Sequence, residues 1–248
     1  MSLKVVLFDF NGVIVNDESI HQALLDEALL SENLRPDPND YKQLCLGRSD
    51  RASLTNLLQK RGRSPDARSL ERLIRQKAIA YQQRLESLPK IPVYPGVEDL
   101  IYKLRVAKIR IGLVTEALRT EVKWVLNRVN LWQYFEVVVG GDETSQSKPD
   151  PQAYCLAIDR FNQLDPSLKL VAQDCLAIED TPVGILSAKN AGIMVVGVAN
   201  TYPFHMIQRQ ANWTVDYLHE LEVDRVRQVL AGHQEWENQD REILENIN

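Results

Sequence analysis

The feature that most constrains the fold is an alternation of short apolar segments with amphipathic ones, interrupted once near the start of the chain. Residues 4–8 consist of Lys4 and the apolar run Val5–Phe8, which includes two β-branched valines and is closed by Gly12, as is typical of a short buried strand. Residues 16–88 contain no strand-like run and are rich in Leu, Gln, Glu, Arg and Ala. From residue 89 onward the alternation resumes. Because alternating strands and helices indicate βαβ units, the sequence predicts a parallel sheet with a helical insert after its first strand.

The segments that follow the insert complete this expectation. Strands are expected at 109–114, 136–139, 174–178 and 193–198, with a last edge strand at 213–215 and helices between them. The predicted fold is therefore an α/β protein with a doubly wound, Rossmann-like parallel sheet as its core. We expect residues 1–15 and 89–225 to form this core, residues 16–88 a helical cap, and residues 226–248 a polar C-terminal tail or helix.

Composition and charge exclude several classes of protein. The chain has 248 residues, 44% of them hydrophobic, which is enough to bury a core without disulfides or structural metals. Its formal net charge of −5 argues against a nucleic-acid partner, which needs a basic face. No segment approaches the roughly 18 consecutive apolar residues of a membrane helix, and the short N-terminal apolar run is no signal peptide. We expect a soluble cytoplasmic protein without membrane contact, a monomer or weak dimer.

Polar side chains follow four of the expected strands. In an open parallel sheet, ligands bind beyond the carboxyl ends of the strands, so side chains placed there are the candidate functional residues. In chain order these residues are Asp9, Thr115, Glu116, Lys148, Glu179 and Asp180.

This set of side chains suits phosphoryl transfer. The carboxylates of Asp9, Glu179 and Asp180 supply clustered oxygen ligands for a hard cation, and Mg²⁺ takes one or two carboxylates together with water or phosphate. A cation and the Lys148 ammonium would neutralise a phosphoryl group, so that a carboxylate at a strand end could attack phosphorus. The Thr115 hydroxyl would hold a phosphoryl oxygen. Each residue alone is better explained as a turn, cap or solvated side chain, but their conjunction in chain order favours the functional interpretation.

Four motifs resemble the haloacid dehalogenase superfamily, and within it the β-phosphoglucomutase-like phosphatase branch. They are the segments 8–14, 113–115, 147–151 and 179–184. The resemblance covers residues 1 to about 225 and implies a C1-type cap over the core. It implies that Asp9 is the nucleophile and a metal ligand, that Thr115, Glu116 and Lys148 contact phosphate, and that Glu179 and Asp180 bind Mg²⁺.

Asn11 departs from the pattern of this family. It stands where the family has its general acid/base aspartate, with its backbone carbonyl on the metal, and an amide can neither protonate an alkoxide nor activate water. General acid–base catalysis contributes roughly 10²–10⁴-fold to a rate. Three explanations stay open: another group acts instead, the substrate has a good leaving group, or the asparagine was introduced to trap a complex. The nearby candidates for a replacement group are Asp17, Glu18, His21 and Glu116.

The expected cap contributes the candidate substrate residues. His21 either faces the site or faces solvent, and Lys77 occupies a position where the resemblance implies a substrate lysine, although a solvated helical lysine is the alternative. The segment 47–51 resembles the substrate loop of the cap, with Gly47, Arg48 and Arg51 as candidates. Mutases carry an arginine where this chain has Asp50, which weakens the mutase interpretation.

These inferences give one leading function and two alternatives. The leading hypothesis is an Mg²⁺-dependent phosphatase that hydrolyses a small phosphorylated metabolite, a sugar phosphate or a nucleotide, through an aspartyl phosphate on Asp9. The first alternative is a phosphosugar mutase. The second is a phosphate-binding or regulatory module, impaired in catalysis because of Asn11. All three predict a small phosphorylated molecule as the partner.

Overall fold

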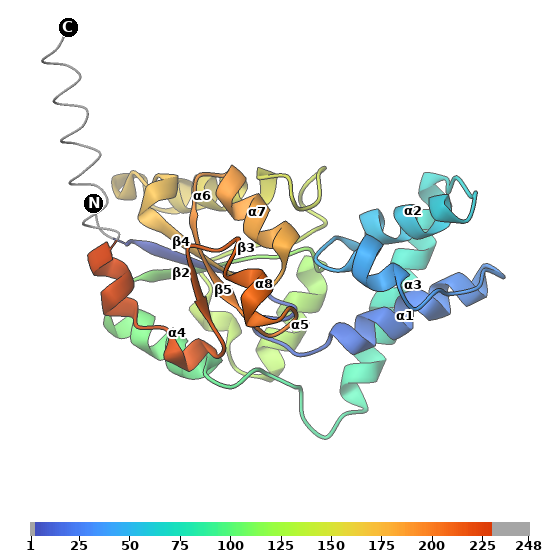
Figure 1. Ribbon diagram of the computed structural model, residues 1–248, viewed down its shortest axis with the longest axis horizontal. Helices are drawn as coiled ribbons and strands as arrows, with labels where there is room; N and C mark the ends of the chain where they lie inside the picture. Colours follow the sequence, from blue (N-terminus) through green and yellow to red (C-terminus); the bar gives the residue numbers. More distant parts are fainter. Residues whose placement is uncertain (1–2, 230–248) are drawn as a thin grey trace, which may run out of the picture.

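The computed structural model describes residues 3–229 and has the predicted architecture of a parallel sheet with a helical cap (Figure 1). Six parallel strands have the order β3-β2-β1-β4-β5-β6. This is the order of a doubly wound sheet, in which strands β2 and β3 are added on one side of β1 and strands β4, β5 and β6 on the other. The predicted fold class is confirmed.

The elements follow the predicted segments closely. The strands are β1 (Val5–Phe8), β2 (Arg110–Val114), β3 (Val137–Val139), β4 (Cys175–Glu179), β5 (Met194–Val198) and β6 (Trp213–Val215). The helices are α1 (Glu18–Ser31), α2 (Asp50–Lys60), α3 (Ala67–Glu86), α4 (Val97–Val106), α5 (Arg119–Arg128), α6 (Gln152–Leu164), α7 (Pro182–Asn190) and α8 (Phe204–Ile207). Short helical turns are η1 (Tyr41–Cys45), η2 (Trp132–Tyr134), η3 (Pro166–Leu168), η4 (Ala172–Asp174) and η5 (Leu218–Glu220).

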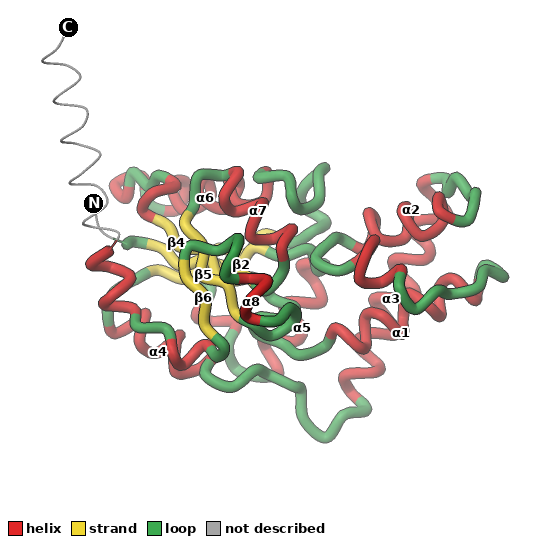
Figure 2. The backbone as a smooth tube through the Cα atoms, in the orientation of Figure 1, coloured by secondary structure: helices red, strands yellow, loops and turns green. Residues whose placement is uncertain are grey.

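The central strand β1 is buried on both faces of the sheet. Its side chains alternate: Val6 and Phe8 join the cluster that includes residues of α4 and α5, while Val5 and Leu7 join the cluster under α6 and α7. Figure 2 shows the strands lying between these two layers of helices. A strand covered on both faces must be apolar throughout, which explains the unbroken run from Val5 to Phe8.

The chain between β1 and α4 forms a separate helical lobe beside the sheet, at the right of Figure 1. Helices α1, α2 and α3 pack around their own small apolar cluster. Helix α2 begins after Ser49, whose side chain accepts a hydrogen bond from the Ala52 amide, as expected for a serine cap. This lobe contacts the core beyond the carboxyl ends of the strands, where Arg48 and Ser49 donate hydrogen bonds to the loop that carries Lys148.

The C-terminal tail expected at 226–248 lies mostly outside the described residues, because residues 230–248 are not among them. Within residues 3–229, no helix combines the length and the apolar character that crossing a bilayer would require.

Candidate active site

The carboxyl end of the sheet gathers three carboxylates with one lysine. Asp9 directly follows β1, Glu179 ends β4, and Asp180 follows it. Their ligand oxygens all lie within 4.8 Å of one another, and all three residues are buried. Lys148 reaches this group from the loop before α6: its Nζ lies 3.2 Å from Asp9 Oδ1 and 2.7 Å from Glu179 Oε1. The topology thus brings together four of the predicted residues.

The carboxylate group has the properties of a divalent-cation site. Glu179 Oε2 and Asp180 Oδ1 are buried without a hydrogen-bond partner among the described residues. Burial and the nearby Asp9 charge raise the pKa of Glu179 to about 8 and hold the pKa of Asp180 well above its ordinary value. A cation bound to these oxygens would satisfy both orphaned atoms and offset the repulsion, so the residues present fit Mg²⁺.

The position of Gly184 next to this site leaves no space for a side chain. A Cβ atom at Gly184, on the first turn of α7, would lie 1.9 Å from Glu179 Oε2. The glycine therefore lets the helix approach the buried carboxylate. Tyr154 of α6 fixes the other oxygen, since its hydroxyl donates to Glu179 Oε1 at 2.6 Å.

Lys148 is held as an ammonium. Burial disfavours its charge, but the surrounding carboxylates of Asp9, Glu179 and Glu116 outweigh this effect and raise its pKa. Its Nζ also lies 3.3 Å from the backbone oxygen of Val114. Thr115 follows β2 on the same edge of the sheet and is buried, with its hydroxyl accepting a hydrogen bond from the Ala117 amide at 3.1 Å.

Glu116 has contacts different from those expected of a phosphate-binding residue. Its Oε1 accepts from the backbone amide of Lys148 at 2.9 Å, and its Oε2 accepts from the Ser147 hydroxyl at 2.6 Å. A carboxylate repels an anion, so these contacts give the side chain a structural partner in the lysine loop instead.

The side-chain amide of Asn11 donates its hydrogen bonds to a buried carboxylate. Its Nδ2 donates to both oxygens of Asp17, at 2.9 and 3.1 Å. Tyr81 of α3 donates to Asp17 Oδ2 at 2.5 Å. Although burial alone would raise it, the contacts with His21, Tyr81 and Asn11 lower the pKa of Asp17, so this buried carboxylate is ionised.

His21 is buried rather than turned to solvent. Its ring stacks on Tyr81 with 4.7 Å between centroids, and its Nε2 lies 3.0 Å from Asn11 Nδ2 and 3.4 Å from Asp17 Oδ2. On the other side, Lys77 Nζ lies 2.8 Å from His21 Nδ1. Burial and the Lys77 ammonium oppose a positive charge on the ring, but the neighbouring Asp17 carboxylate outweighs them and raises the pKa of His21.

Of the two interpretations of Lys77, the solvated lysine is wrong. The residue is 3% exposed, and its ammonium lies 2.7 Å from Asp50 Oδ1. The spacing of the buried residues of α3 explains its position: Leu70, Leu73, Lys77, Tyr81 and Leu85 form one stripe on the helix. That stripe was the signal that could have identified Lys77 and Tyr81 as interior residues.

Within the segment 47–51, Gly47 and Arg48 lie at the site, whereas Arg51 lies on the surface. Gly47 has φ +73°, and a Cβ there would lie 2.6 Å from Val183 Cγ2, so the cap loop packs directly on the core. Arg48 lines the site and donates to the backbone oxygen of Lys148 at 3.3 Å. Arg51 is exposed and lies 3.9 Å from Glu71 on the outer surface, so the structure does not bring this predicted residue to the site.

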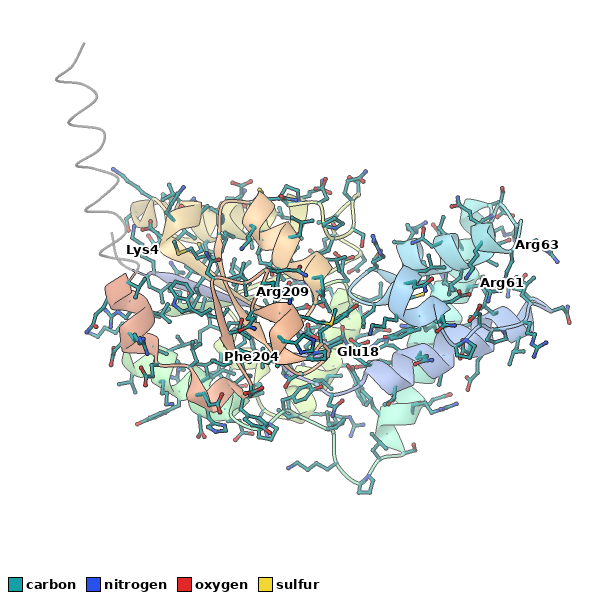
Figure 3. All side chains as sticks on the ribbon, in the orientation of Figure 1. Lys4, Glu18, Arg61, Arg63, Phe204 and Arg209 are labelled. Atoms are coloured by element: carbon teal, nitrogen blue, oxygen red, sulfur yellow. The ribbon has the colours of Figure 1, made fainter. Side chains whose placement is uncertain are left out.

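A small cavity of about 40 Å³ separates the cap from Asp9. Glu18, labelled in Figure 3 at the junction of the two lobes, lines it and accepts a hydrogen bond from the Tyr41 hydroxyl. Known ligand pockets occupy roughly 300–1,000 Å³. In this structure the cavity is therefore smaller than the pockets that hold whole ligands.

Comparisons with known proteins agree with this geometry. The family model described as Haloacid dehalogenase-like hydrolase matches residues 6–198. The β-phosphoglucomutase of Bacillus subtilis is 28% identical over 225 residues, covering 88% of this chain and 95% of that protein. The validoxylamine A 7'-phosphate phosphatase of Streptomyces hygroscopicus subsp. limoneus is 27% identical over 199 residues, covering 80% of this chain and 87% of that protein.

The fold is also found among solved structures. The β-phosphoglucomutase structure from Clostridium difficile aligns with a TM-score of 0.79 at 21% identity, over 94% of this chain and 99% of that one. The predicted resemblance, and with it the prediction of an enzyme, is confirmed. The chain belongs to the haloacid dehalogenase-like hydrolases, and it is similar to the β-phosphoglucomutases among them.

Proposed function

We propose that this enzyme is an Mg²⁺-dependent phosphatase that hydrolyses a small phosphorylated metabolite through an aspartyl phosphate on Asp9. The observation that carries the proposal is the buried group at the end of β1 and β4. There Lys148 lies 3.2 Å from Asp9, while Glu179 and Asp180 each keep one oxygen without a partner. Several relatives are named as phosphatases or mutases of phosphorylated carbohydrates, which supports the same class of substrate.

Each residue has a defined part in the proposed reaction. A carboxylate oxygen of Asp9 attacks phosphorus, and the bond between phosphorus and the leaving oxygen breaks. Lys148 stays charged beside Asp9 and offsets the negative charge of the incoming phosphoryl group. Mg²⁺ bound by Asp9, Glu179, Asp180 and the Asn11 backbone carbonyl would neutralise further phosphoryl charge. Water then attacks phosphorus, which releases phosphate and restores the Asp9 carboxylate.

The leaving oxygen still needs a proton, and the Asn11 amide cannot supply one. Among the four candidates to replace it, Asp17 and Glu116 are each held by two or more donors from the protein. Glu18 and His21 remain, and both line the cavity beside Asp9. Burial raises the pKa of Glu18, so this carboxyl holds its proton to a higher pH than an exposed glutamate does.

The charges around the cavity favour a monophosphate with an uncharged, hydroxyl-bearing leaving group. Arg48 carries the permanent positive charge of the cavity wall, whereas Glu18, Asp50 and Glu116 line the same space. Lys77 lies behind His21 and is paired with Asp50. A mutase that holds a bisphosphate would need a second cationic subsite, so these charges favour hydrolysis over isomerisation.

Phosphate release from a panel of sugar phosphates, nucleotides and p-nitrophenyl phosphate tests this proposal. We expect release that needs Mg²⁺, disappears with a chelator, and is lost in Asp9→Ala. Faster isomerisation of a sugar phosphate than phosphate release would favour the mutase alternative. Binding without turnover would favour a phosphate-binding module. The double substitution Asn11→Asp with Asp17→Asn serves as the positive control, since it restores an acid at position 11 without adding charge.

A further inference from the structure

A chain of hydrogen bonds joins the helical cap to the loop that carries Lys148. Two consecutive cap residues donate to two consecutive core residues: the backbone amide of Ser49 to Ser147 Oγ at 3.1 Å, and the Arg48 guanidinium to the backbone oxygen of Lys148 at 3.3 Å. Ser49 and Ser147 are 98 residues apart in the sequence. The contact therefore exists only while the cap lies on the core.

The direction of this chain is fixed by the chemistry of its members. The Ser147 hydroxyl has a single proton, and it donates this proton to Glu116 Oε2 at 2.6 Å, because an ionised carboxylate only accepts. The hydroxyl oxygen is then free to accept from the Ser49 amide. Each bond polarises the next, so the carboxylate makes Ser147 a better acceptor for the cap.

The same carboxylate also fixes the backbone of the proposed catalytic lysine. Glu116 Oε1 accepts from the Lys148 amide at 2.9 Å, and the side chain of Lys148 reaches Asp9 and Glu179. Glu116 is 9% exposed and bonds both to the residue that receives the cap and to the residue that contacts the nucleophile. Its position at the end of β2 anchors both contacts to the sheet.

We propose that Glu116 is a positioning residue, and that the Glu116–Ser147–Ser49 chain is a latch that stabilises the closed cap and aligns Lys148 when the cap closes. The effect on turnover rests on the proposed phosphatase function. The latch itself rests on the contacts alone, and it can be tested in the protein without any substrate.

Hydrogen–deuterium exchange of the full chain tests the latch directly. In Ser147→Ala the Ser49 amide loses its acceptor, and we expect its exchange to become roughly fivefold faster, the equilibrium factor of one ordinary hydrogen bond. Ser145→Ala is the matched control, because Ser145 Oγ lies in the same loop and bonds Gln152 without touching the cap. Equal exchange of the segment 46–52 in the two variants would overturn the latch.

A second comparison separates the latch from a structural role. Ser49→Pro removes the backbone donor at φ −64°, which proline can adopt, and Ser49→Ala keeps it, while both lose the capping hydroxyl of α2. With an active substrate, we expect Ser49→Pro to lower kcat/KM about fivefold below Ser49→Ala, and to have no further effect in Ser147→Ala. Full additivity of the two changes would show that Ser49 and Ser147 are not coupled. If no substrate is turned over, the exchange result still decides the latch.

Discussion

Replacing Asn11 by aspartate should destabilise this protein at high pH, although the family to which it belongs has an aspartate there. The new carboxylate would stand where Asn11 Nδ2 now lies 2.9 Å from the ionised Asp17. Two unit charges at this separation repel by about 5.7 kcal/mol at an effective dielectric constant of about 20. The pair can avoid this energy by keeping one proton, so the pKa of one carboxyl rises.

The cost of keeping that proton sets the pH dependence. A carboxyl with an ordinary pKa near 3.9 in the unfolded state costs up to about 5.6 kcal/mol to hold protonated at pH 8, but about 1.5 kcal/mol at pH 5. Because the pKa is raised in the folded state, stability is lost as pH rises above the unfolded value. Asn11→Asp should therefore lower the free energy of unfolding by about 3–5 kcal/mol at pH 8 and by about 1–2 kcal/mol at pH 5.

Urea unfolding followed by circular dichroism at the two pH values measures this difference. The double variant Asn11→Asp with Asp17→Asn is the matched control, since it keeps one charge and one amide in the pair and should recover most of the loss. A single variant that loses the same free energy at pH 5 and pH 8 would refute the reasoning, because charge repulsion between residues 11 and 17 would then not be its cause.

Three further predictions follow from the buried groups. Gly184→Ala should destabilise the protein by about 1–3 kcal/mol, because the new Cβ would occupy the space of Glu179 Oε2. The same change should abolish Mg²⁺ binding measured by calorimetry, and an unchanged Mg²⁺ affinity would contradict this prediction. Lys77→Met should cost about 1–3 kcal/mol in urea unfolding, since it leaves the half-buried Asp50 carboxylate unpaired, and adding Asp50→Asn should restore much of the loss. Mg²⁺ affinity should rise from about pH 6 to pH 8, because Glu179 has a pKa of about 8 and must release its proton to bind the cation; an affinity independent of pH would place the metal elsewhere.

The sequence predicted the parts of this molecule that depend on local pattern and on sheet topology. The apolar run before Asp9, the helical insert, and the strand ends that carry Lys148 and Glu179 all follow from periodicity and from the rule that parallel strands share one carboxyl edge. These features need no knowledge of which distant side chains meet.

The features that the sequence did not predict depend on contacts between side chains that are far apart in the sequence. Lys77 was assigned to solvent as one alternative because charged side chains usually lie there, but Asp50 neutralises it inside the cap. The family resemblance implies that Glu116 contacts phosphate, whereas its oxygens accept from the Lys148 amide and the Ser147 hydroxyl in the structure. Arg51 is one residue beyond the capped start of α2, where the helix turns its side chain away from the site.

The buried carboxylates also bear on whether Asn11 marks a protein that has lost its chemistry. Glu179 and Asp180 are fully buried, each with an oxygen that no described residue satisfies, and such groups are costly unless a cation or a proton compensates them. A module that only bound phosphate would gain nothing from Asp9 beside them, since a third carboxylate repels an anion. The amide of Asn11, by contrast, donates to both oxygens of Asp17, whose carboxylate also accepts from Tyr81, so the surroundings of position 11 suit an amide. These surroundings support our proposal that Asp9 is the nucleophile beside a cation-binding group and that another residue supplies the acid function, for which Glu18 and His21 are the candidates that line the cavity.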